Sequence, residues 1–514
     1  MAQRLNGHGK LDRALRKLRS SRLFRTRGAK PVIRPVHAGQ PVERLMADQL
    51  FSRVAGSAPV QGNIVRLLRD GAENYPAWLE AIADAQQFIH FENYIFRGDN
   101  IGRQFAAALA AKAADGVAVR VLYDWMGSFR QVPFGFWRRL RAAGVEVRCF
   151  NRPRLDSPFG WLSRNHRKTV SVDGTVGFVA GLCVGDAWVG NPARHIPAWR
   201  DTGIAIRGPA VADLDAAFAE SWSHAGGEPP ELPTAPIEPV PEVPAPLGRI
   251  ALRVIASKPN TMGLYRFDQL IAGIARRSLW LTDAYFVGTT AYVRTLCDAA
   301  RDGVDVRLLV PGASDILVAK ALSRAGYRPL LDAGIRVFEW NGPMLHAKTA
   351  VADGRWARIG SSNLNLASWL GNWELDIAIE DAGFAAEMEA MFEADLQNAT
   401  EIVLDLGRVH STVPRSRRRA RRGSPGRLAA GAVGLGSVVS AAITNHRVLG
   451  PAEAKVMAAC AALLLGLSAV AVAAPRLLTI PLAVVAAWVA VTLLVRAWRL
   501  RTNPVLPDSE ISGS

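Results

Sequence analysis

Hydrophobic and polar positions in the central part of the chain follow two alternating periods. Short runs rich in Val, Ile and Phe, bounded by Gly, are typical of buried strands. Between them lie Ala-, Leu- and Arg-rich stretches whose apolar residues recur every three or four positions, as in amphipathic helices. We expect such helices over residues 101–115, 135–143, 290–302 and 316–333. Strands alternating with helices predict an α/β core.

The strand-like runs of the first half return in the second half. Three segments match at nearly constant offsets of 191, 187 and 190 residues: 91–96 with 282–287, 116–122 with 303–309, and 143–147 with 333–337. Near-constant offsets over three segments indicate an internal duplication. We therefore predict two similar lobes, each a mixed sheet flanked by helices, related by a pseudo-twofold axis.

A proline-rich segment separates the two halves. Residues 226–248 contain eight prolines between Pro229 and Pro246, which neither a helix nor a central strand accommodates. We expect an extended linker there. It divides lobe 1 from lobe 2, so that the predicted order is a basic N-terminal segment (1–50), lobe 1 (51–225), the linker (226–248) and lobe 2 (249–407).

The end of the chain is apolar. Three apolar stretches cover residues 428–444, 456–474 and 477–495, and the last two have the length needed to span a bilayer. We accordingly predict an Arg-rich juxtamembrane segment (408–427), a membrane region (428–501) and a tail (502–514). A buried helical hairpin of a soluble domain is the alternative.

Basic residues flank the apolar stretches on both sides. Seven Arg lie within residues 415–427, and Arg496, Arg499 and Arg501 follow the last stretch. Because basic flanks favour the cytoplasmic side, we expect a two-helix hairpin that turns at Pro475 and Arg476, with residues 428–444 at the membrane interface. Both ends of the chain then face the cytoplasm.

The charge of the chain is concentrated in its flanks. The net charge is +17, of which residues 1–44 carry +10 and residues 415–427 carry +7, so the remaining residues sum to zero. A neutral core does not favour nucleic acid as a partner, whereas basic segments beside apolar helices favour anionic lipid headgroups. The four cysteines fit neither a zinc spacing nor a disulfide framework, and residues 1–30 lack a secretory signal, which together favour a reducing compartment.

One motif occurs once in each half. Residues 165–174 and 345–354 both contain His-x-Lys-x4-Asp-Gly, in a chain with only nine His and nine Lys. The motif residues are His166, Lys168 and Asp173 in the first copy and His346, Lys348 and Asp353 in the second. If each copy begins a strand, positions i and i+2 share a face and place each imidazole beside a lysine.

This combination suits phosphoryl transfer. An imidazole can attack phosphorus, a lysine can hold the charged oxygens, and a second His brought to the same interface can protonate the leaving oxygen. A solvated surface pair is the alternative for a single copy, but duplication argues against it. We expect no metal, because carboxylates are few and two lysines would repel a cation.

The paired motifs resemble those of the phospholipase D superfamily, and the surrounding sequence is similar to bacterial cardiolipin synthases. The resemblance covers roughly residues 60–405 and rests on Tyr75-Pro76, Glu92-x-Tyr94 and residues 122–128, 164–168 and 199–202. It implies an enzyme of a bacterial inner membrane that works without a cofactor. One His would attack a phosphatidyl phosphorus to form a phosphohistidine, and a second phosphatidylglycerol would resolve it, giving cardiolipin and glycerol.

The resemblance also implies roles for individual residues. His166 would be the nucleophile and His346 the general acid and base, although the reverse assignment is open. Lys168 and Lys348 would hold the phosphate, and Asp173 and Asp353 would complete the motifs, mainly by supporting the lobes. The supporting and phosphate-binding candidates are Asn363, Ser361, Asp201, Glu374 and Glu92, of which Asp201 and Glu374 would orient the two imidazoles.

The first half departs from the family at one position. Cys183 stands where the second half has Asn363, and a thiol is a weak donor, so the phosphate would lose a hydrogen bond of roughly 0.5–1.5 kcal/mol. A catalytic role for this thiol is an alternative. The sequence also leaves open hydrolysis by water, a nuclease or phosphodiesterase activity, and a lipid-binding protein without activity. It does not determine the acceptor lipid or the oligomeric state.

Overall fold

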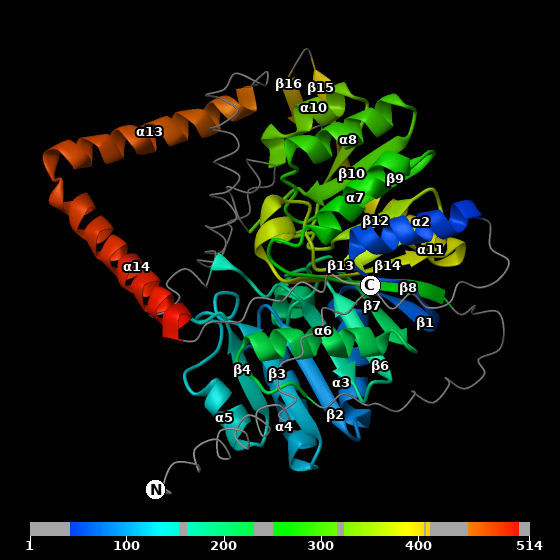
Figure 1. Cartoon of the computed structure of the whole chain (residues 1–514). Coiled ribbons are helices and arrows are strands. Elements are labelled where there is room, and N and C mark those ends of the chain that lie inside the picture. Colours follow the sequence, from blue (N-terminus) through cyan, green and yellow to red (C-terminus); the bar gives the residue numbers. More distant parts are fainter. Residues whose placement is uncertain are drawn as a thin grey trace, which may run out of the picture. The chain divides into compact units, whose positions relative to one another are not determined.

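The computed structural model describes residues 42–153, 162–230, 250–315, 323–405, 408–411 and 451–502 (Figure 1). The chain divides into one unit up to Ala58 and a second unit from Pro59 onward. The described part of the first unit contains helix α2 (Val42–Ala55). The predicted basic segment therefore lies almost wholly outside the described residues, as do most of the proline-rich linker and the apolar stretch at 428–444.

The second unit is built on a mixed sheet of sixteen strands. Its first half contains β1 (Val60–Arg69), α3 (Asp70–Asp84), β2 (Phe88–Asn93), α4 (Asn100–Ala114), β3 (Ala118–Asp124), α5 (Phe136–Ala142), β4 (Glu146–Phe150), β5 (Lys168–Val172), β6 (Val176–Ala180), β7 (Thr202–Arg207) and α6 (Val211–His224). These elements run from blue to green in Figure 1.

The second half follows in green and yellow. It contains β8 (Ile250–Ser257), α7 (Gly263–Ile274), β9 (Ser278–Thr282), α8 (Thr290–Arg301), β10 (Asp305–Pro311), α10 (Tyr327–Asp332), β11 (Arg336–Trp340), β12 (Thr349–Ala352), β13 (Trp356–Gly360), β14 (Glu374–Glu380), α11 (Ala382–Leu396), β15 (Ala399–Asp405) and β16 (Arg408–Ser411). The predicted α/β core with a large mixed sheet is confirmed. The predicted helices match α4, α5, α8 and α10, although residues 316–322 are not described.

The strand order is β16-β15-β11-β10-β9-β12-β13-β14-β8-β1-β7-β6-β5-β2-β3-β4. Strands β2, β3 and β4 are mutually parallel, as are β9, β10 and β11, whereas β5 is antiparallel to β2 and β12 to β9. Lys168 at the start of β5 pairs with Asn93 at the end of β2. The two His-x-Lys motifs therefore lie at the edge where the parallel strands end, which is where α/β sheets commonly bind ligands.

The two halves share a hydrophobic core. One buried cluster lies within the first half and centres on Trp78, which makes edge or tilted contacts with Phe91, Phe105 and Phe178. A second cluster draws on both halves and includes Leu67, Val179, Ile204, Leu252, Leu345 and Leu375. Because burial of apolar area is the main driving force of folding, this shared cluster holds the halves together.

Two helices form the described part of the C-terminal region. Helix α13 (Pro451–Ala473) and helix α14 (Arg476–Thr502) are separated at Ala474 and Pro475, where the expected turn lies. Among the described residues, the segment Arg476–Val495 is long and apolar enough, by length and composition, to cross a membrane. The two-helix hairpin and its orientation stay predictions.

Asn63 lies at the junction of the halves, where the pairing of β1 with β8 is irregular. This buried amide donates to the carbonyls of Val60 (2.7 Å) and Ile250 (3.3 Å) and accepts from the Ala210 amide (2.9 Å). Replacing it with Leu would remove the side-chain partner of one buried and two partly buried backbone groups. We expect Asn63→Leu to lower the free energy of unfolding by about 1–3 kcal/mol, seen as a lower Tm. Exposed Asn100→Leu is the control, and equal Tm values for the two variants would contradict this role.

Candidate active site

Both motif histidines lie on short segments whose backbone is hydrogen-bonded to the opposite half of the chain. The His166 amide donates to the Trp373 carbonyl at 2.8 Å, and the Trp373 amide donates to the Arg164 carbonyl at 2.7 Å. The second motif repeats this arrangement, since the His346 amide donates to the Arg200 carbonyl at 2.7 Å. Strands β5 and β12 begin only at Lys168 and Thr349. The prediction that the histidines begin strands is therefore wrong, because their backbone bonds go to the opposite half.

Each lysine folds back under its histidine. The ammonium groups of Lys168 and Lys348 donate to the main-chain oxygens of His166 and His346. The Lys168 Nζ lies 5.2 Å from the centre of the Tyr94 ring, and Tyr94 in turn contacts the His166 imidazole edge-on at 4.8 Å. Both ammonium groups are buried. Each lysine therefore lies close to its histidine, as predicted. The reason differs from the predicted alternation along a strand, because the lysine side chain folds back toward the histidine main chain.

The two imidazoles receive their acids from opposite halves. His166 Nδ1 lies 2.9 Å from Glu374 Oε2, and His346 Nδ1 lies 2.8 Å from Asp201 Oδ2. Sequence reasoning selected both acids as the orienting residues but did not foresee the exchange, in which the acid downstream of one motif contacts the histidine of the other. With Nδ1–H donated to a carboxylate, Nε2 keeps the lone pair of the neutral imidazole.

The two carboxylates are held differently. Glu374 accepts from Ser361 Oγ at 2.6 Å and from Asn372 Nδ2 at 3.1 Å, so Ser361 contacts the orienting acid. Asp201 accepts instead from Trp188 Nε1 at 2.9 Å. Gly181 occupies the position equivalent to Ser361, and a Cβ there would lie 2.1 Å from Asp201 Oδ1. The carboxylate of Asp201 thus fills the space that a serine side chain would need.

Burial and mutual charge shift the pKa values of the whole cluster. Burial, together with the neighbouring lysines, lowers the pKa of His166 and of His346 to about 4, against the opposing effect of the acids. Burial also lowers the pKa of Lys168 to about 8. For Glu374 burial acts upward, yet the adjacent His166 and Lys168 hold the carboxyl pKa below its usual value. At neutral pH the cluster therefore contains neutral imidazoles, a charged ammonium group on Lys168 and ionised carboxylates, while burial also lowers the pKa of Lys348.

The motif aspartates lie at the other end of the strands. Asp173 accepts backbone N–H bonds from Gln86 (2.7 Å), Gln87 (2.8 Å) and Phe88 (2.7 Å), and Asp353 accepts from the backbone of residues 276–278 at 2.7–3.1 Å. Both residues have positive φ, 52° and 55°. The structure does not bring them to the histidines. It places them in turns at the start of β2 and β9, where their carboxylates accept backbone N–H bonds.

The remaining candidates, Asn363, Cys183 and Glu92, are all buried. Asn363 is buried, and its side-chain oxygen has no partner among the described residues. Cys183 is fully buried, and burial raises the pKa of its thiol while the nearby Lys168 opposes this. Glu92 lies below the first motif, where it accepts from Asn165 Nδ2 at 2.5 Å and Ser221 Oγ at 2.5 Å. It thus supports the segment that carries His166.

Two buried arginines were not singled out from the sequence. Arg167 donates to the carbonyls of Glu374 (3.2 Å), Ala217 (2.8 Å) and Ser257 (3.3 Å) and so joins α6, β8 and β14. Its position inside the first motif, where the second motif has Ala347, was the available signal. Both facts place Arg167 as a fixed support for the strand that begins with Glu374.

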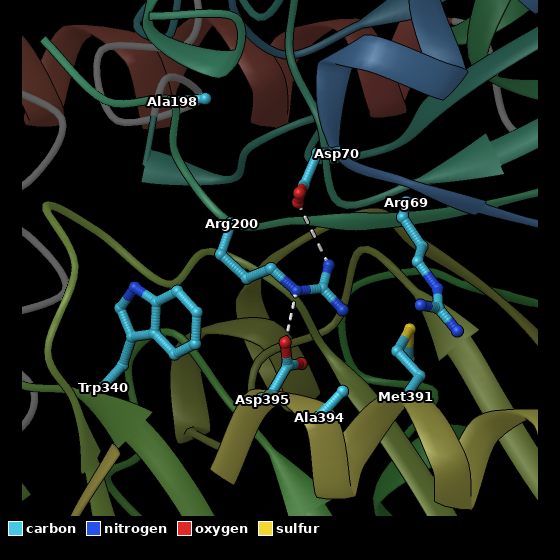
Figure 2. A pocket seen from close by; sticks show the side chains of 8 residues that line it. All are labelled: Arg69, Asp70, Ala198, Arg200, Trp340, Met391, Ala394 and Asp395. Carbon is cyan, nitrogen blue, oxygen red and sulfur yellow. Dashed lines mark hydrogen bonds and ion pairs between the residues drawn. The ribbon is translucent and has the colours of Figure 1, made fainter. Parts of the chain in front are cut away.

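Arg200 precedes the orienting acid Asp201. Its side chain lies between Asp70 (3.2 Å) and Asp395 (2.8 Å) beside a cavity of about 250 Å³, as Figure 2 shows. Its main chain bonds to Met344 and His346 of the other half. Arg200 therefore anchors the crossing segment through both its backbone and its charge. Its position in the segment Trp199–Thr202, which resembles the family, was the feature of the sequence that could have identified it.

Known proteins are similar to this chain in sequence. A family model described as cardiolipin synthase, phospholipase D-like domain, matches residues 78–184 and again residues 270–396. The cardiolipin synthase of Alkalihalophilus pseudofirmus is 34% identical over 366 residues, which cover 70% of this chain and 72% of that protein. Cardiolipin synthase A of Pseudomonas aeruginosa is 34% identical over 394 residues, covering 76% and 77%. The chain belongs to the cardiolipin synthase family.

A solved structure supports the fold of this family member. The crystal structure of phosphatidylserine synthase from Haemophilus influenzae aligns with a TM-score of 0.52 at 15% identity and covers 69% of this chain and 92% of that one. At this identity the likeness concerns the fold alone. Each of the two family matches contains one His-x-Lys-x4-Asp motif, and the resemblance inferred from the sequence is thereby confirmed.

Asp173→Ala tests the structural role of the motif aspartates. Removing a carboxylate that accepts three backbone N–H bonds should lower the free energy of unfolding by about 1.5–3 kcal/mol. Asp173→Asn keeps one acceptor oxygen and tolerates positive φ, so its Tm should fall less. Thermal unfolding of the two variants measures the difference. Equal stability of Asp173→Ala and the unsubstituted chain would show that these bonds do not hold the turn.

Proposed function

We propose that this family member is a membrane-bound phosphatidyltransferase that makes cardiolipin and glycerol from two phosphatidylglycerol molecules. The observation that carries the proposal is the pair of buried His–carboxylate contacts, each completed by the opposite half and each accompanied by a buried lysine. Neither half has a complete site alone. The names of the relatives and the apolar helix α14 support the lipid substrate and the membrane location.

The proposed architecture is two phospholipase D-like lobes about a pseudo-twofold axis. The strand order from the β1–β8 junction supports it. On one side the order is β1-β7-β6-β5-β2-β3-β4, and on the other side it is β8-β14-β13-β12-β9-β10-β11. Each strand of the first series has its counterpart seven positions later in the numbering. Two half-sites related in this way would meet at the crossing segments of His166 and His346.

In the first chemical step, Nε2 of His166 attacks the phosphorus of a phosphatidylglycerol. The P–N bond forms as the bond from phosphorus to the glycerol oxygen breaks, and the glycerol oxygen takes a proton from His346. Lys168 and Lys348 hold the non-bridging oxygens. The bound phosphodiester anion offsets the two ammonium charges that lower the pKa of His346, so this imidazole can carry the proton that it delivers.

In the second step, the acceptor is the free glycerol hydroxyl of another phosphatidylglycerol. Neutral His346 removes its proton as the oxygen attacks phosphorus, the P–N bond breaks, and His166 is released as a neutral imidazole. Glu374 and Asp201 keep both rings in the tautomer with Nε2 toward the substrate. No metal enters this sequence of steps.

The assignment of His166 as nucleophile rests on family resemblance and fits the asymmetry of the two carboxylates. Glu374 has three side-chain donors, from His166, Ser361 and Asn372, and so holds the His166 ring in a polar frame. The His346 ring packs beside Trp188 and Trp199 at 5.7 and 5.9 Å. In the second half, the amide of Asn363 would donate a hydrogen bond to the substrate phosphate. In the first half, the thiol of Cys183 would be only a weak donor to it.

The proposed site is tested with the purified full chain in phosphatidylglycerol vesicles. His166→Ala and His346→Ala should each abolish cardiolipin formation, a loss of at least about 10³-fold, because one variant lacks the nucleophile and the other the proton carrier. His195→Ala is the matched control, since His195 is exposed and lies outside the cluster. Lipid extracts are compared by mass spectrometry.

The products decide between related reactions. If phosphatidic acid is the main product, the enzyme hydrolyses the phospholipid and does not transfer the phosphatidyl group to a second lipid. Full activity of either histidine variant would refute the composite site. Covalent phosphate retained on His346→Ala but not on His166→Ala would support His166 as nucleophile, and the opposite result would exchange the two roles.

The pH dependence reports the buried lysines. Because burial lowers the pKa of Lys168 to about 8, its charged form is present below that pH and is lost as the pH rises through it. We expect kcat/KM to fall above about pH 8. In Lys168→Arg the guanidinium stays charged, so the residual activity should fall only at higher pH. An unchanged midpoint in Lys168→Arg would assign the alkaline loss to another group.

A further inference from the structure

We propose that the loop between β3 and α5, residues 125–135, is a docking surface for an anionic lipid bilayer and presents that bilayer to the His166 half of the site. The inference rests on the proposed function, because the substrate would lie in the same bilayer. It concerns a surface that is separate from the apolar C-terminal helices.

The loop exposes aromatic side chains that a soluble surface would not favour. Phe134 is 95% exposed and Phe129 is 36% exposed. Among the described residues 59–411, seven large hydrophobic side chains are exposed to this degree: Phe129, Phe134, Leu162, Ile196, Ile274, Leu366 and Val403. The first four and Leu366 lie on loops that lead to or from the catalytic edge of the sheet. Exposed apolar side chains gathered at one edge mark an interaction surface.

The positive charge around Phe134 indicates that the partner of this surface is anionic. Residues 125–142 contain Arg130, Arg138, Arg139 and Arg141, all exposed, and no Asp or Glu. The guanidinium carbon of Arg138 lies 6.0 Å from the centre of the Phe134 ring. An apolar ring that enters the acyl region, with guanidinium groups at the level of the headgroups, fits an anionic bilayer. The partially exposed Trp125 and Trp137 are of the type that favours the membrane–water interface.

The loop is fixed to the segment that carries His166. The carboxylate of Asp124 accepts from the amides of Met126 and Gly127, both at 2.9 Å, and from the Asn165 amide at 2.9 Å. Asn165 immediately precedes His166. One buried carboxylate therefore holds the base of the loop and the approach to the proposed nucleophile.

A second connection runs through Tyr94. Ser128 Oγ accepts from the Phe96 amide at 3.0 Å and donates to the Tyr94 carbonyl at 3.2 Å. Gly127 packs so closely that a Cβ there would lie 2.2 Å from the Tyr94 carbonyl oxygen. Tyr94 contacts the His166 imidazole. The loop is thus a rigid extension of the site.

This geometry has a consequence for substrate access. The phosphate of a phospholipid lies at the headgroup level, which is where the arginines of a docked loop would also lie. A site fixed to that loop can reach the phosphate while the acyl chains stay in the bilayer. Docking therefore avoids the cost of withdrawing a whole lipid into water.

The test uses the full chain reconstituted in vesicles, with a fluorophore on Phe134→Cys. Thr175→Cys is the control, because Thr175 is exposed on the β5–β6 turn at the opposite end of β5. The unsubstituted chain, labelled in the same way, gives the background from its native cysteines. In vesicles containing phosphatidylglycerol, the label at 134 should be several-fold less accessible to aqueous acrylamide than the label at 175. Equal quenching at the two positions would overturn the proposal.

A second measurement separates docking from chemistry. Phe134→Ser should lower transfer from phosphatidylglycerol in vesicles by about tenfold, whereas Phe134→Leu, which keeps an apolar side chain, should lower it much less. With a short-chain phosphatidylglycerol below its critical micelle concentration, both variants should match the unsubstituted chain. An equal loss on the monomeric lipid would place Phe134 in the site and overturn docking.

The remaining outcomes are also decisive. If the unsubstituted chain has no transferase activity, the proposed function fails, while the quenching measurement still tests docking. If the label at 134 becomes protected as the protein concentration rises without lipid, the surface binds a second copy of this chain, and the bilayer proposal is wrong.

Discussion

The exchange of carboxylates between the two halves is the contact on which the rest of the site depends. Each imidazole takes its orienting acid from the other half, Glu374 for His166 and Asp201 for His346. The backbone crosses at the same places, since each histidine amide donates to a carbonyl of the opposite half. Separating the halves would remove the imidazole partner of each acid and leave Glu374 and Asp201 only the donors of their own halves. The site and the junction are thus one structure.

The supports of this junction are buried and polar. Arg167 is fully buried and donates to carbonyl oxygens of three elements, and Arg200 lies between Asp70 and Asp395. Such groups are expensive to bury, and a hydrophobic core alone would hold the halves at lower cost. The arginines fix the orientation of the segments that they bind, because each guanidinium has several donors in a fixed plane. Positions of the acids are therefore set by hydrogen-bond geometry in addition to close packing.

Much of the fold and of the site could be predicted from the sequence. The β-branched runs and their near-constant offsets predicted the alternating elements, and the two His-x-Lys-x4-Asp motifs predicted the residues of the proposed site. The family was recognised from the same residues. The location of His166 before β5 could not be predicted, because β propensity describes local conformation, whereas this segment bonds to Trp373, over two hundred residues away. The exchange of Glu374 and Asp201 depends on the same long-range pairing. The burial of Arg167 and the exposure of Phe134 likewise depend on the folded structure, and the periodicity of apolar residues in the sequence does not reveal them.

The charges of the cluster fit the two proposed steps. With neutral imidazoles and both lysines in their charged form, the two ammonium groups and the two orienting carboxylates sum to zero. Entry of a phosphodiester adds one negative charge, and one proton on an imidazole restores neutrality. Burial and, after it, the ammonium groups lower both imidazole pKa values to about 4, so in the proposed mechanism the bound anion favours protonation by offsetting the ammonium charges. In the proposed first step, the substrate thereby favours the protonated imidazole that its own leaving group needs. In the proposed second step, after the neutral glycerol has left with that proton, His346 serves as a base for the acceptor hydroxyl.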